Sequence, residues 1–470
     1  MKISYFPFLS TRAAVLVLVC ISLLVDVGIY GFIVPALPEI LQGEFKASES
    51  LNGFFVALYG LGVLIGAPTS SYLSDKYKKR KLPMEIGFII LAVSSLGIGY
   101  STNIAQAFIS RAGQGVASGI IWSIGLACVI DIYTSDKLDA PISIVYSGFT
   151  MGALGGPILG GVVYKYFGRK GMGYFMFGAS IAILVLRFFI PDSKDLRIIL
   201  ALDQQLKEQE TNNTQPPLNP LPEDSPNDNE INNVPSPVIT TDNSTDSEKN
   251  SSAKKYKEIT YLSMLKEARI LLLCLIVVFT YGLTSSVEVV VPLEFDIKGL
   301  AADKIGYTFL AFSVPSMIGG LIMGKILESK RFTEKFGPYK KRFVVILTGN
   351  FLAGIFTIIL GASKSIPLSV VLMGFIGFCI GSGNVPILSA LGAHILDMTD
   401  PNDSGANSKV YSLFNIAYSV AALVIPSIAS ILYKSIGMFL TCLFLGLILT
   451  ISAIVLMGYA LLRTNDIILS

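Results

Sequence analysis

The residues best placed to do chemistry in this sequence are charged side chains inside apolar runs. The first is Asp26, in the stretch LLVDVGIYGFIVPALPEIL (23–41), and its run carries no other charge between Ala13 and Glu39. A carboxylate in a hydrocarbon environment costs several kcal/mol unless it is paired or protonated. Ionisable groups at such positions bind protons, ions or cationic ligands, so Asp26 is predicted to be functional.

Two further charges lie in comparable positions, Arg111 in SRAGQG and Glu288 in SSVEVVVP. With a helical rise of about 1.5 Å per residue, Asp26 lies about 20 Å and Arg111 about 13 Å into their runs, which enter from opposite faces. Tyr30 follows Asp26 by one turn and shares its face. One cation and two carboxylates leave one net negative charge for a proton or an organic cation. Burial favours the neutral form of a carboxyl group, while a nearby arginine favours the charged form.

Two structural interpretations stay open beside the functional one. Asp26 and Arg111 can form a structural ion pair. Glu288 can instead reach the outer surface, because Pro292 soon follows it. Trp122, the only tryptophan, is expected near the end of a helix, where this residue type anchors a helix at the membrane interface.

The composition is that of a membrane protein. Of 470 residues, 52% are hydrophobic and 15% charged, and the mean hydropathy is +0.64. Soluble domains hold about a quarter charged residues. The net charge of +3 gives no reason to expect a nucleic-acid partner. The chain has one histidine, no phosphate-binding loop signature, and five cysteines that all lie in apolar runs, so we expect no enzyme activity, cofactor, metal or disulfide framework.

Apolar runs long enough to span a bilayer predict an all-α membrane protein with 12 transmembrane helices. They lie near 13–38, 51–73, 83–101, 104–131, 141–164, 171–190, 269–293, 304–327, 342–362, 366–396, 408–433 and 436–462. Between the sixth and the seventh lies a segment rich in Asn, Pro, Ser, Thr, Asp and Glu. Such a composition cannot bury enough apolar surface to fold, so it predicts a disordered linker. The predicted domains are a six-helix bundle (1–190), this linker (191–265) and a second six-helix bundle (266–470).

The two predicted bundles repeat each other weakly. GPILGGVVYKYFG (156–168) and IPSIASILYKSIG (425–437) share a proline, a tyrosine, a lysine and a glycine at matching offsets. SYLSDK (71–76) likewise matches GKILES (324–329). Two such repeats predict a pseudo-twofold molecule with a site at the repeat interface, near the middle of the membrane. This is the architecture of a transporter.

The short loops predict the orientation. The loop DKYKKRK (75–81) carries five Lys/Arg and the loop ESKRFTEKFGPYKKR (328–342) carries six, while most loops on the opposite face carry none or one. Because positive loops stay in the cytoplasm, both termini and the linker are expected there. The protein is thus expected to be an integral multi-pass membrane protein, either of the plasma membrane or of a vacuolar or vesicular membrane.

Three motifs resemble signatures of the major facilitator superfamily. SYLSDKYKKRK resembles the loop motif after span 2, with Ser71 and Lys78 in place of its glycines, and RAGQGVASG resembles the span-4 motif. GALGGPILGG matches the span-5 motif, which in this superfamily marks drug:proton antiporters. The loop motif implies a cytoplasmic gate in which Asp75 caps a neighbouring helix or pairs with a base. Its charged residues are Asp75, Lys76, Lys79 and Arg80, and the span-5 motif comprises Gly152, Gly156, Pro157, Gly160 and Gly161.

Within that group the chain resembles vesicular amine transporters and their fungal relatives. Those proteins carry a span-1 aspartate followed by two prolines, here Asp26, Pro35 and Pro38. They also carry a span-7 glutamate followed by a proline, here Glu288 and Pro292. The resemblance implies that these two acids engage a cationic amine.

The sequence also departs from that pattern. Amine transporters pair a span-2 lysine with a span-11 aspartate, and the matching residues here are Tyr59 and Asn415. The position of their span-10 aspartate is Gly381, with Asn384 the nearest polar group. The proton route and the monoamine substrate of that family therefore do not transfer to this chain.

Together these observations predict a proton-coupled antiporter that moves a small organic cation, such as an amine, polyamine or drug, by alternating access. The predicted substrate- or proton-binding residues are Asp26, Tyr30, Arg111, Glu288 and Asn415. Its expected partners are protons, the substrate and the lipid bilayer, and we expect a monomer. Two alternatives stay open: a symporter or facilitator for an uncharged nutrient or metabolite, and a sensor or scaffold that transports nothing.

Overall fold

Every regular element in the described part of the chain is a helix. The computed structural model describes residues 11–37, 39–47, 51–77, 79–193, 195–196, 198, 260–300, 304, 307–338, 340–398 and 405–467. Nine helical segments within these ranges are long and apolar enough to cross a membrane. Two of them, α5 (Asp139–Phe189) and α14 (Gly405–Ile467), each contain two helices that meet at a glycine. With α2 (Leu51–Tyr77) they make up the 12 spans that the sequence predicts.

The first half of the chain forms six of these helices. They are α1 (Arg12–Phe32), α2, α3 (Lys81–Tyr100), α4 (Ile104–Ile132) and the two helices of α5. Side-chain caps fix two of their starts: Thr11 accepts a hydrogen bond from the Ala14 amide over 3.1 Å, and Asn103 accepts one from the Gln106 amide over 3.0 Å. Short 3-10 segments, η2 (Val34–Ala36) and η4 (Ser135–Lys137), and a π-helical segment, η3 (Glu39–Glu44), complete this half.

The second half repeats the arrangement. Its long helices are α8 (Ala268–Ile297), α10 (Leu310–Glu328), α12 (Lys340–Ala362), α13 (Ile366–Met398) and the two helices of α14. Two short helices, α7 (Tyr261–Lys266) and α11 (Lys330–Phe336), precede α8 and α12. We call the end of the helices at which α1 begins and α5 finishes the linker end, and the opposite end the far end.

The internal repeat seen in the sequence appears as matching geometry at the far end. Gly168 breaks α5 at φ 61° and Gly437 breaks α14 at φ 76°, a backbone conformation that glycine adopts without steric cost. Four residues before each break, a tyrosine donates a hydrogen bond to a glutamate. Tyr164 bonds Glu44 over 3.4 Å, and Tyr433 bonds Glu294 over 3.0 Å.

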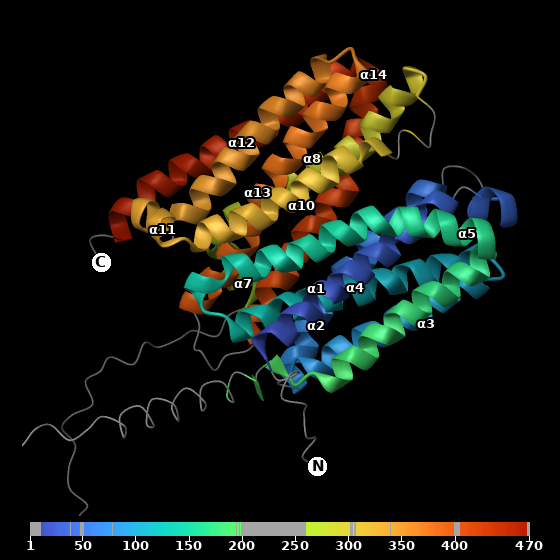
Figure 1. Cartoon of the computed structure of the whole chain (residues 1–470), viewed down its shortest axis with the longest axis horizontal. Helices are drawn as coiled ribbons and strands as arrows, with labels where there is room; N and C mark the ends of the chain where they lie inside the picture. Colours follow the sequence, from blue (N-terminus) through green and yellow to red (C-terminus); the bar gives the residue numbers. More distant parts are fainter. Residues whose placement is uncertain are drawn as a thin grey trace, which may run out of the picture. The chain divides into compact units, whose positions relative to one another are not determined.

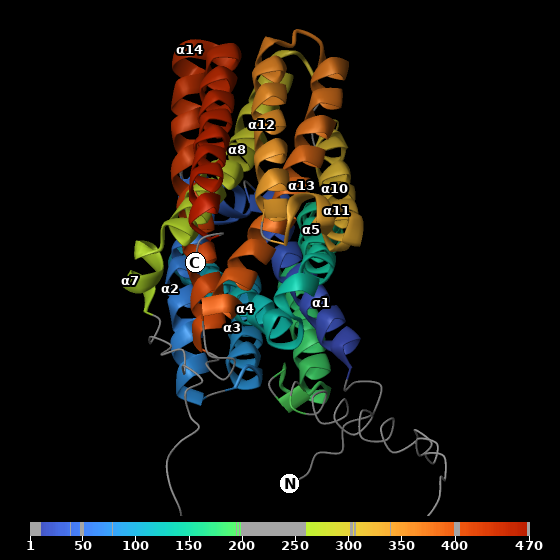
Figure 2. The ribbon, with the colours of Figure 1, turned by 90° about the vertical axis from the view of Figure 1, so that its left-hand side faces the viewer.

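Helix packing follows the same repeat. In the first half α1 packs on α5, α2 on α4, and α3 on both α4 and α5. In the second half α8 packs on α14, α10 on α13, and α12 on both α13 and α14. The halves meet where α5 contacts α10 and where α2 and α4 contact α14. Figures 1 and 2 show α1, which carries Asp26, running beside α5.

The structure differs from the sequence-based helix boundaries in two places, at the end of the first span and at Pro292. The first span is predicted to reach residue 38, but α1 ends at Phe32, and Pro35 lies in η2. Pro292 does not end α8, which continues to Ile297 because a helix in a bundle tolerates an internal proline. Pro38 lies outside the described residues.

The ends of the predicted linker 191–265 are structured. Asp192 and Ser193 are buried, and Thr260 caps the start of α7 in a capping box with Ser263. Composition alone does not reveal these contacts, because they depend on the placement of particular partners. Residues 194, 197 and 199–259 of the predicted linker lie outside the described residues.

Candidate functional site

Asp26 lies at the centre of a hydrogen-bonded group on the inner face of α1. Its side chain is 1% exposed. The Oδ2 atom accepts a hydrogen bond of 2.6 Å from the Ser118 hydroxyl and one of 3.1 Å from the Trp122 indole N–H, both from α4. The buried Oδ1 atom accepts no bond within the described part of the chain. Asp26 is therefore bound by neutral donors.

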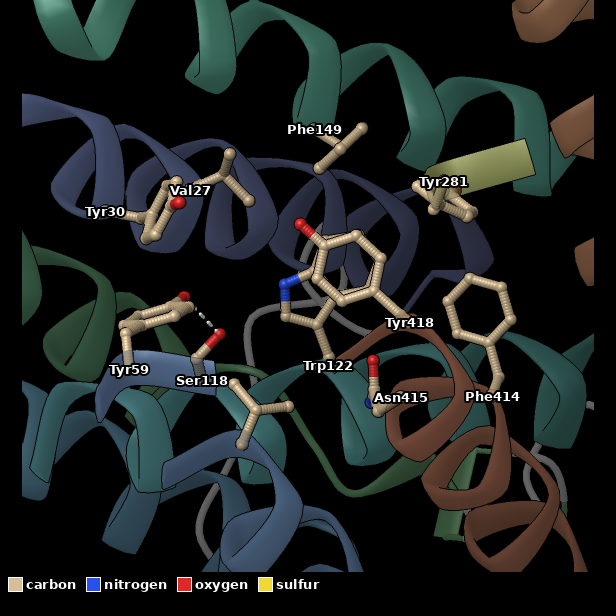
Figure 3. A pocket seen from close by; sticks show the side chains of 11 residues that line it. Val27, Tyr30, Tyr59, Ser118, Trp122, Phe149, Tyr281, Phe414, Asn415 and Tyr418 are labelled. Carbon is tan, nitrogen blue, oxygen red and sulfur yellow. Dashed lines mark hydrogen bonds between the residues drawn. The ribbon is translucent and has the colours of Figure 1, made fainter. Parts of the chain in front are cut away.

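The group continues to α2 through a second hydroxyl. Tyr59 donates a hydrogen bond of 2.7 Å to the Ser118 oxygen, so Tyr59, Ser118 and Asp26 form one chain of hydrogen bonds. Figure 3 shows the bond between Tyr59 and Ser118 at one side of a pocket. Hydroxyl groups both donate and accept, so such a chain can pass a proton along its length.

Arg111 lies beside this group but is not bonded to Asp26. Its guanidinium is fully buried, 4.9 Å from the ring centre of Tyr30 and 4.8 Å from that of Tyr59. It donates hydrogen bonds to Gln114 Oε1 over 3.0 Å and to the Tyr30 carbonyl over 3.3 Å. The ion pair with Asp26 that the sequence left open is absent from the salt bridges of the described residues. Cation–π contacts with the two rings take its place.

A pocket opens between the two halves, directly beside this group (Figure 3). Its cavity volume is about 20 Å³, so in the state described here it has room for about one water molecule. Its walls are mostly aromatic, and no lining side chain carries a formal charge. They comprise Val27, Tyr30, Tyr59, Val63, Ser118, Trp122, Phe149, Tyr281, Phe414, Asn415 and Tyr418.

Glu288 approaches the pocket from α8. Its side chain is exposed, and it interacts electrostatically with the hydroxyl groups of Tyr30 and Tyr418, which both line the pocket. Asp26 and Glu288 therefore reach the same tyrosine-lined space from different halves of the chain. One carboxyl group is enclosed behind the pocket wall, and the other is open.

Asn415 joins the two halves beside the pocket. Its amide nitrogen donates a hydrogen bond of 2.9 Å to the Ser123 hydroxyl on α4. Its amide oxygen is turned toward Trp122 and Tyr418 in Figure 3 and is available as an acceptor. Tyr59 and Asn415, which the sequence resemblance aligns with a lysine–aspartate pair, bond different partners here, Ser118 and Ser123.

The residues of the span-2 loop motif have different environments. Arg80 is fully buried and bonds Asp131 on α4, with 2.9 Å from Nε to Oδ2 and 3.2 Å from Nη2 to Oδ1. Lys79 is exposed, and Lys76 is exposed and lies over two tyrosine rings. The side chain of Asp75 lies outside the described part of the structure, so its predicted capping role stays a prediction.

The second half carries a contact of the kind predicted for Asp75. Glu328, which the repeat aligns with Asp75, accepts a hydrogen bond of 2.9 Å from the Ala140 amide in the first turn of α5. Further bonds tie the halves at the same linker end. Asn407 donates to Asp131 over 3.0 Å, and Arg342 donates from Nε to Asp139 over 2.9 Å. The described structure is therefore closed at the linker end.

The span-5 motif places Asp26 by bringing α5 close to α1. A Cβ atom at Gly152 would lie 2.4 Å from the Leu24 carbonyl oxygen, and one at Gly156 would lie 2.4 Å from the Gly28 carbonyl oxygen. Gly160 is tighter still, because a Cβ there would lie 1.9 Å from the Phe32 carbonyl. Gly161 has more room, and the Pro157 ring packs against Gly31. These glycines allow backbone-to-backbone contact along the helix that carries the buried acid.

Sequence reasoning missed three members of the site. Trp122 is not an interfacial anchor: its N–H bonds Asp26, and its ring lines the pocket. Ser118 and Tyr59 were not predicted as a bonded pair. A signal was present for α4, because Ser118 and Trp122 follow Arg111 by seven and eleven residues and so share its helix face.

Comparison with known proteins places these features in a family. A family model described as the Major Facilitator Superfamily matches residues 19–401. An uncharacterized MFS-type transporter of Schizosaccharomyces pombe is 26% identical over 187 residues, which cover 38% of this chain and 41% of that protein. The probable vesicular acetylcholine transporter-A of Danio rerio is 27% identical over 179 residues, covering 34% of this chain and 35% of that protein. The matched regions thus span less than half of each of these two relatives.

A solved structure agrees over nearly the whole length. The proton:xylose symporter XylE, bound to 6-bromo-6-deoxy-D-glucose, superposes with a TM-score of 0.68 at 14% identity, over 96% of both chains. A likeness at this identity shows the fold alone.

Proposed function

The chain belongs to the Major Facilitator Superfamily, and we propose that it is a proton-coupled antiporter that moves a small organic cation by alternating access. One observation carries the proposal: an aromatic pocket between the two halves has a buried carboxyl group behind it and an exposed one beside it. The electron-rich faces of aromatic rings attract organic cations. The two carboxyl groups give the site places for a proton and for a positive charge.

The coupling follows from the charges around the pocket. Asp26 and Glu288 carry up to two negative charges, and Arg111 carries one positive charge, so both acids ionised give the site one net negative charge. A bound cation or a bound proton neutralises that charge. Binding of a proton weakens binding of the substrate, and the reverse also holds. The binding site therefore changes sides of the membrane carrying either a proton or a substrate, which is the requirement for antiport.

The state described here fits one half of the transport cycle. Bonds at the linker end hold the halves together, and the positive charge of the loops at that end supports a cytoplasmic location for it. On this assignment the structure is closed to the cytoplasm. Transport requires these bonds to break while the far end closes, as rigid bundles rock around the central pocket.

Proton flux in liposomes tests the proposal. Purified protein would be reconstituted with an internal pH dye, given a pH gradient, and challenged with amines, polyamines and cationic drugs. We expect amine-triggered proton release in the wild type and at least a tenfold loss in Asp26→Asn. Ser22→Ala is the matched control, because this buried hydroxyl on α1 bonds the Leu18 carbonyl of its own helix. Release unchanged in Asp26→Asn would exclude Asp26 from the coupling.

A second candidate is transport of an uncharged ligand with ring and hydroxyl groups. It is favoured by the pocket wall itself, where tyrosine hydroxyls and the Asn415 amide offer hydrogen bonds and no formal charge. The same liposomes would be challenged with uncharged sugars and aromatic metabolites. Proton movement with these compounds, and none with any cation, would replace the antiport proposal by symport of an uncharged substrate.

The third possibility is a sensor or scaffold that moves nothing. Removing residues 200–250 distinguishes it from a transporter. A transporter should keep its flux without this segment, since the pocket and the bonds at the linker end are formed by other residues. Loss of the cellular phenotype on this deletion, together with no flux from the full-length protein in liposomes, would support a signalling role instead of transport.

A further inference from the structure

The two acids of the site meet the pocket in different ways. Asp26 is 1% exposed and does not line the pocket, and two residues that do line it, Ser118 and Trp122, donate hydrogen bonds to its Oδ2. Glu288 is exposed and reaches pocket tyrosines from the other half. An organic cation needs a wider pocket than the one described here, and in such a pocket it would meet the exposed Glu288, whereas Asp26 is buried and its Oδ2 is already bonded by Ser118 and Trp122.

On the basis of the antiport proposed above, we propose that Asp26 is the proton site, loaded from the pocket through the hydroxyls of Tyr59 and Ser118, and that Glu288 is the counterion of the cation. The proton and the substrate then occupy different atoms. They compete because an ionised Asp26, close behind the wall, strengthens the attraction of the pocket for a positive charge.

The relay is balanced in protons and bonds. A hydronium ion in the pocket gives a proton to the Tyr59 oxygen and remains as water, the Tyr59 proton moves to the Ser118 oxygen, and the Ser118 proton moves to Asp26 Oδ2. The two hydrogen bonds, of 2.7 Å and 2.6 Å, then point in the opposite direction, from Asp26 toward the pocket. The net result is one proton transferred from the pocket to Asp26, and release runs the same steps in reverse.

Trp122 has a different part in this group. An indole N–H only donates, so its 3.1 Å bond to Oδ2 keeps one direction whatever the charge of Asp26. It is a positioning residue that fixes Oδ2 toward Ser118. Because Trp122 is the only tryptophan among 470 residues, its fluorescence reports the state of this one carboxyl group.

Other titratable groups also face Asp26. Tyr59 from α2, Arg111 from α4 and Tyr418 from α14 interact with it electrostatically. The facing part of α5 consists of the glycines packed on α1. Arg111 is held by Gln114 and by the Tyr30 and Tyr59 rings, so it lies near Asp26 without occupying its oxygens.

The first test follows Trp122 emission against pH in the purified full-length protein without substrate. We expect a transition in the wild type and in Glu288→Gln, and none in Asp26→Asn. A transition that persists in Asp26→Asn, or that is absent from the wild type, would overturn the assignment of the proton to Asp26.

The second test measures the rate of that emission change after a rapid pH jump. Ser118→Ala and Tyr59→Phe remove one hydroxyl each and should slow the emission change at least tenfold. Ser118→Thr retains the hydroxyl and should keep the rate of the wild type. Ser22→Ala should match the wild type, since its hydroxyl lies outside the relay. Equal rates in all variants would overturn the relay, because a purely structural role would not be rescued by threonine.

The third test separates the two acids in liposomes. Asp26→Asn should keep cation-for-cation exchange without a pH gradient but lose proton-driven uptake at least tenfold, while Glu288→Gln should lose both. The reverse pattern would overturn the division of roles. If the wild type moves no cation at all, the antiport proposal fails, whereas the two fluorescence tests still decide whether Asp26 is loaded through the relay.

Discussion

Arg342 on α12 and Asp139 at the start of α5 form a buried ion pair across the two halves, with 2.9 Å between Nε and Oδ1. Arg342 also donates to Oδ2 over 3.1 Å, and both side chains are less than 5% exposed. Asp139 further accepts a hydrogen bond from the Ser389 hydroxyl of α13. This cluster is a latch that must open whenever the linker end opens.

Arg342→Gln should therefore shift the protein toward opening at the linker end. Removing one partner of a buried ion pair costs about 3–5 kcal/mol, although Lys341, whose ammonium lies 3.8 Å from Asp139, offsets part of the loss. We expect at least a tenfold faster labelling of a cysteine placed at Ser143, which is buried against Gly324 of the other half. The background would lack the five natural cysteines. Lys340→Gln, an exposed neighbour, is the control, and an equal rate in both variants would show that the pair is no latch.

The adjacent glycines of the span-5 motif give a matched pair of substitutions. A Cβ at Gly156 would lie 2.4 Å from the Gly28 carbonyl, whereas a Cβ at Gly155 would meet nothing within 4 Å. Gly156→Ala should push α5 from α1, displace Asp26 and reduce transport at least tenfold. Gly155→Ala should keep activity and gain stability of up to about 1 kcal/mol from the helix propensity of alanine. Transport rates and apparent Tm measure both effects, and equal behaviour would show that close packing of the two helices is not needed.

Sequence patterns predicted the helices well, because length and hydropathy decide what crosses a membrane. The repeat aligns Gly168 with Gly437, and in the structure both glycines have a positive φ where the chain turns at the far end. The site was harder to predict. Asp26 was found because a charge stands out in an apolar run, but Ser118 and Trp122 look like ordinary helix residues until α4 is placed against α1. The sequence left open an ion pair between Arg111 and Asp26, and the structure has contacts of Arg111 with two tyrosine rings instead.

The two far-end turns should both require glycine. Backbone at φ 61° and ψ −169° for Gly168, and at φ 76° and ψ 177° for Gly437, is strained for any residue with a Cβ, at a cost of about 1–3 kcal/mol. Gly168→Ala and Gly437→Ala should each lower the apparent Tm. Gly178→Ala is the control, because this helical glycine also has open space around it but has no positive φ. A Tm unchanged in all three variants would argue that the turns relax at no cost.

Lys79 and Arg80 are neighbouring bases of the loop motif, but their environments in the structure differ. Arg80 is fully buried, bonds both oxygens of Asp131, and donates from Nη1 to the Ser74 hydroxyl over 2.5 Å. Arg80→Gln leaves the buried Asp131 without its cation, which costs about 3–5 kcal/mol. We expect poor yield of folded protein on size-exclusion chromatography, whereas the exposed Lys79→Gln should behave as the wild type.

A double substitution distinguishes this charge effect from a loss of packing. Arg80→Gln combined with Asp131→Asn removes both charges and leaves two amides that can bond each other, so folded yield should recover at least partly. Asn407 donates to Asp131 Oδ1 over 3.0 Å and can still donate to the amide oxygen that Asp131→Asn introduces, which preserves this link between the halves. If the double variant folds no better than Arg80→Gln alone, the arginine acts through its packing and not through its charge.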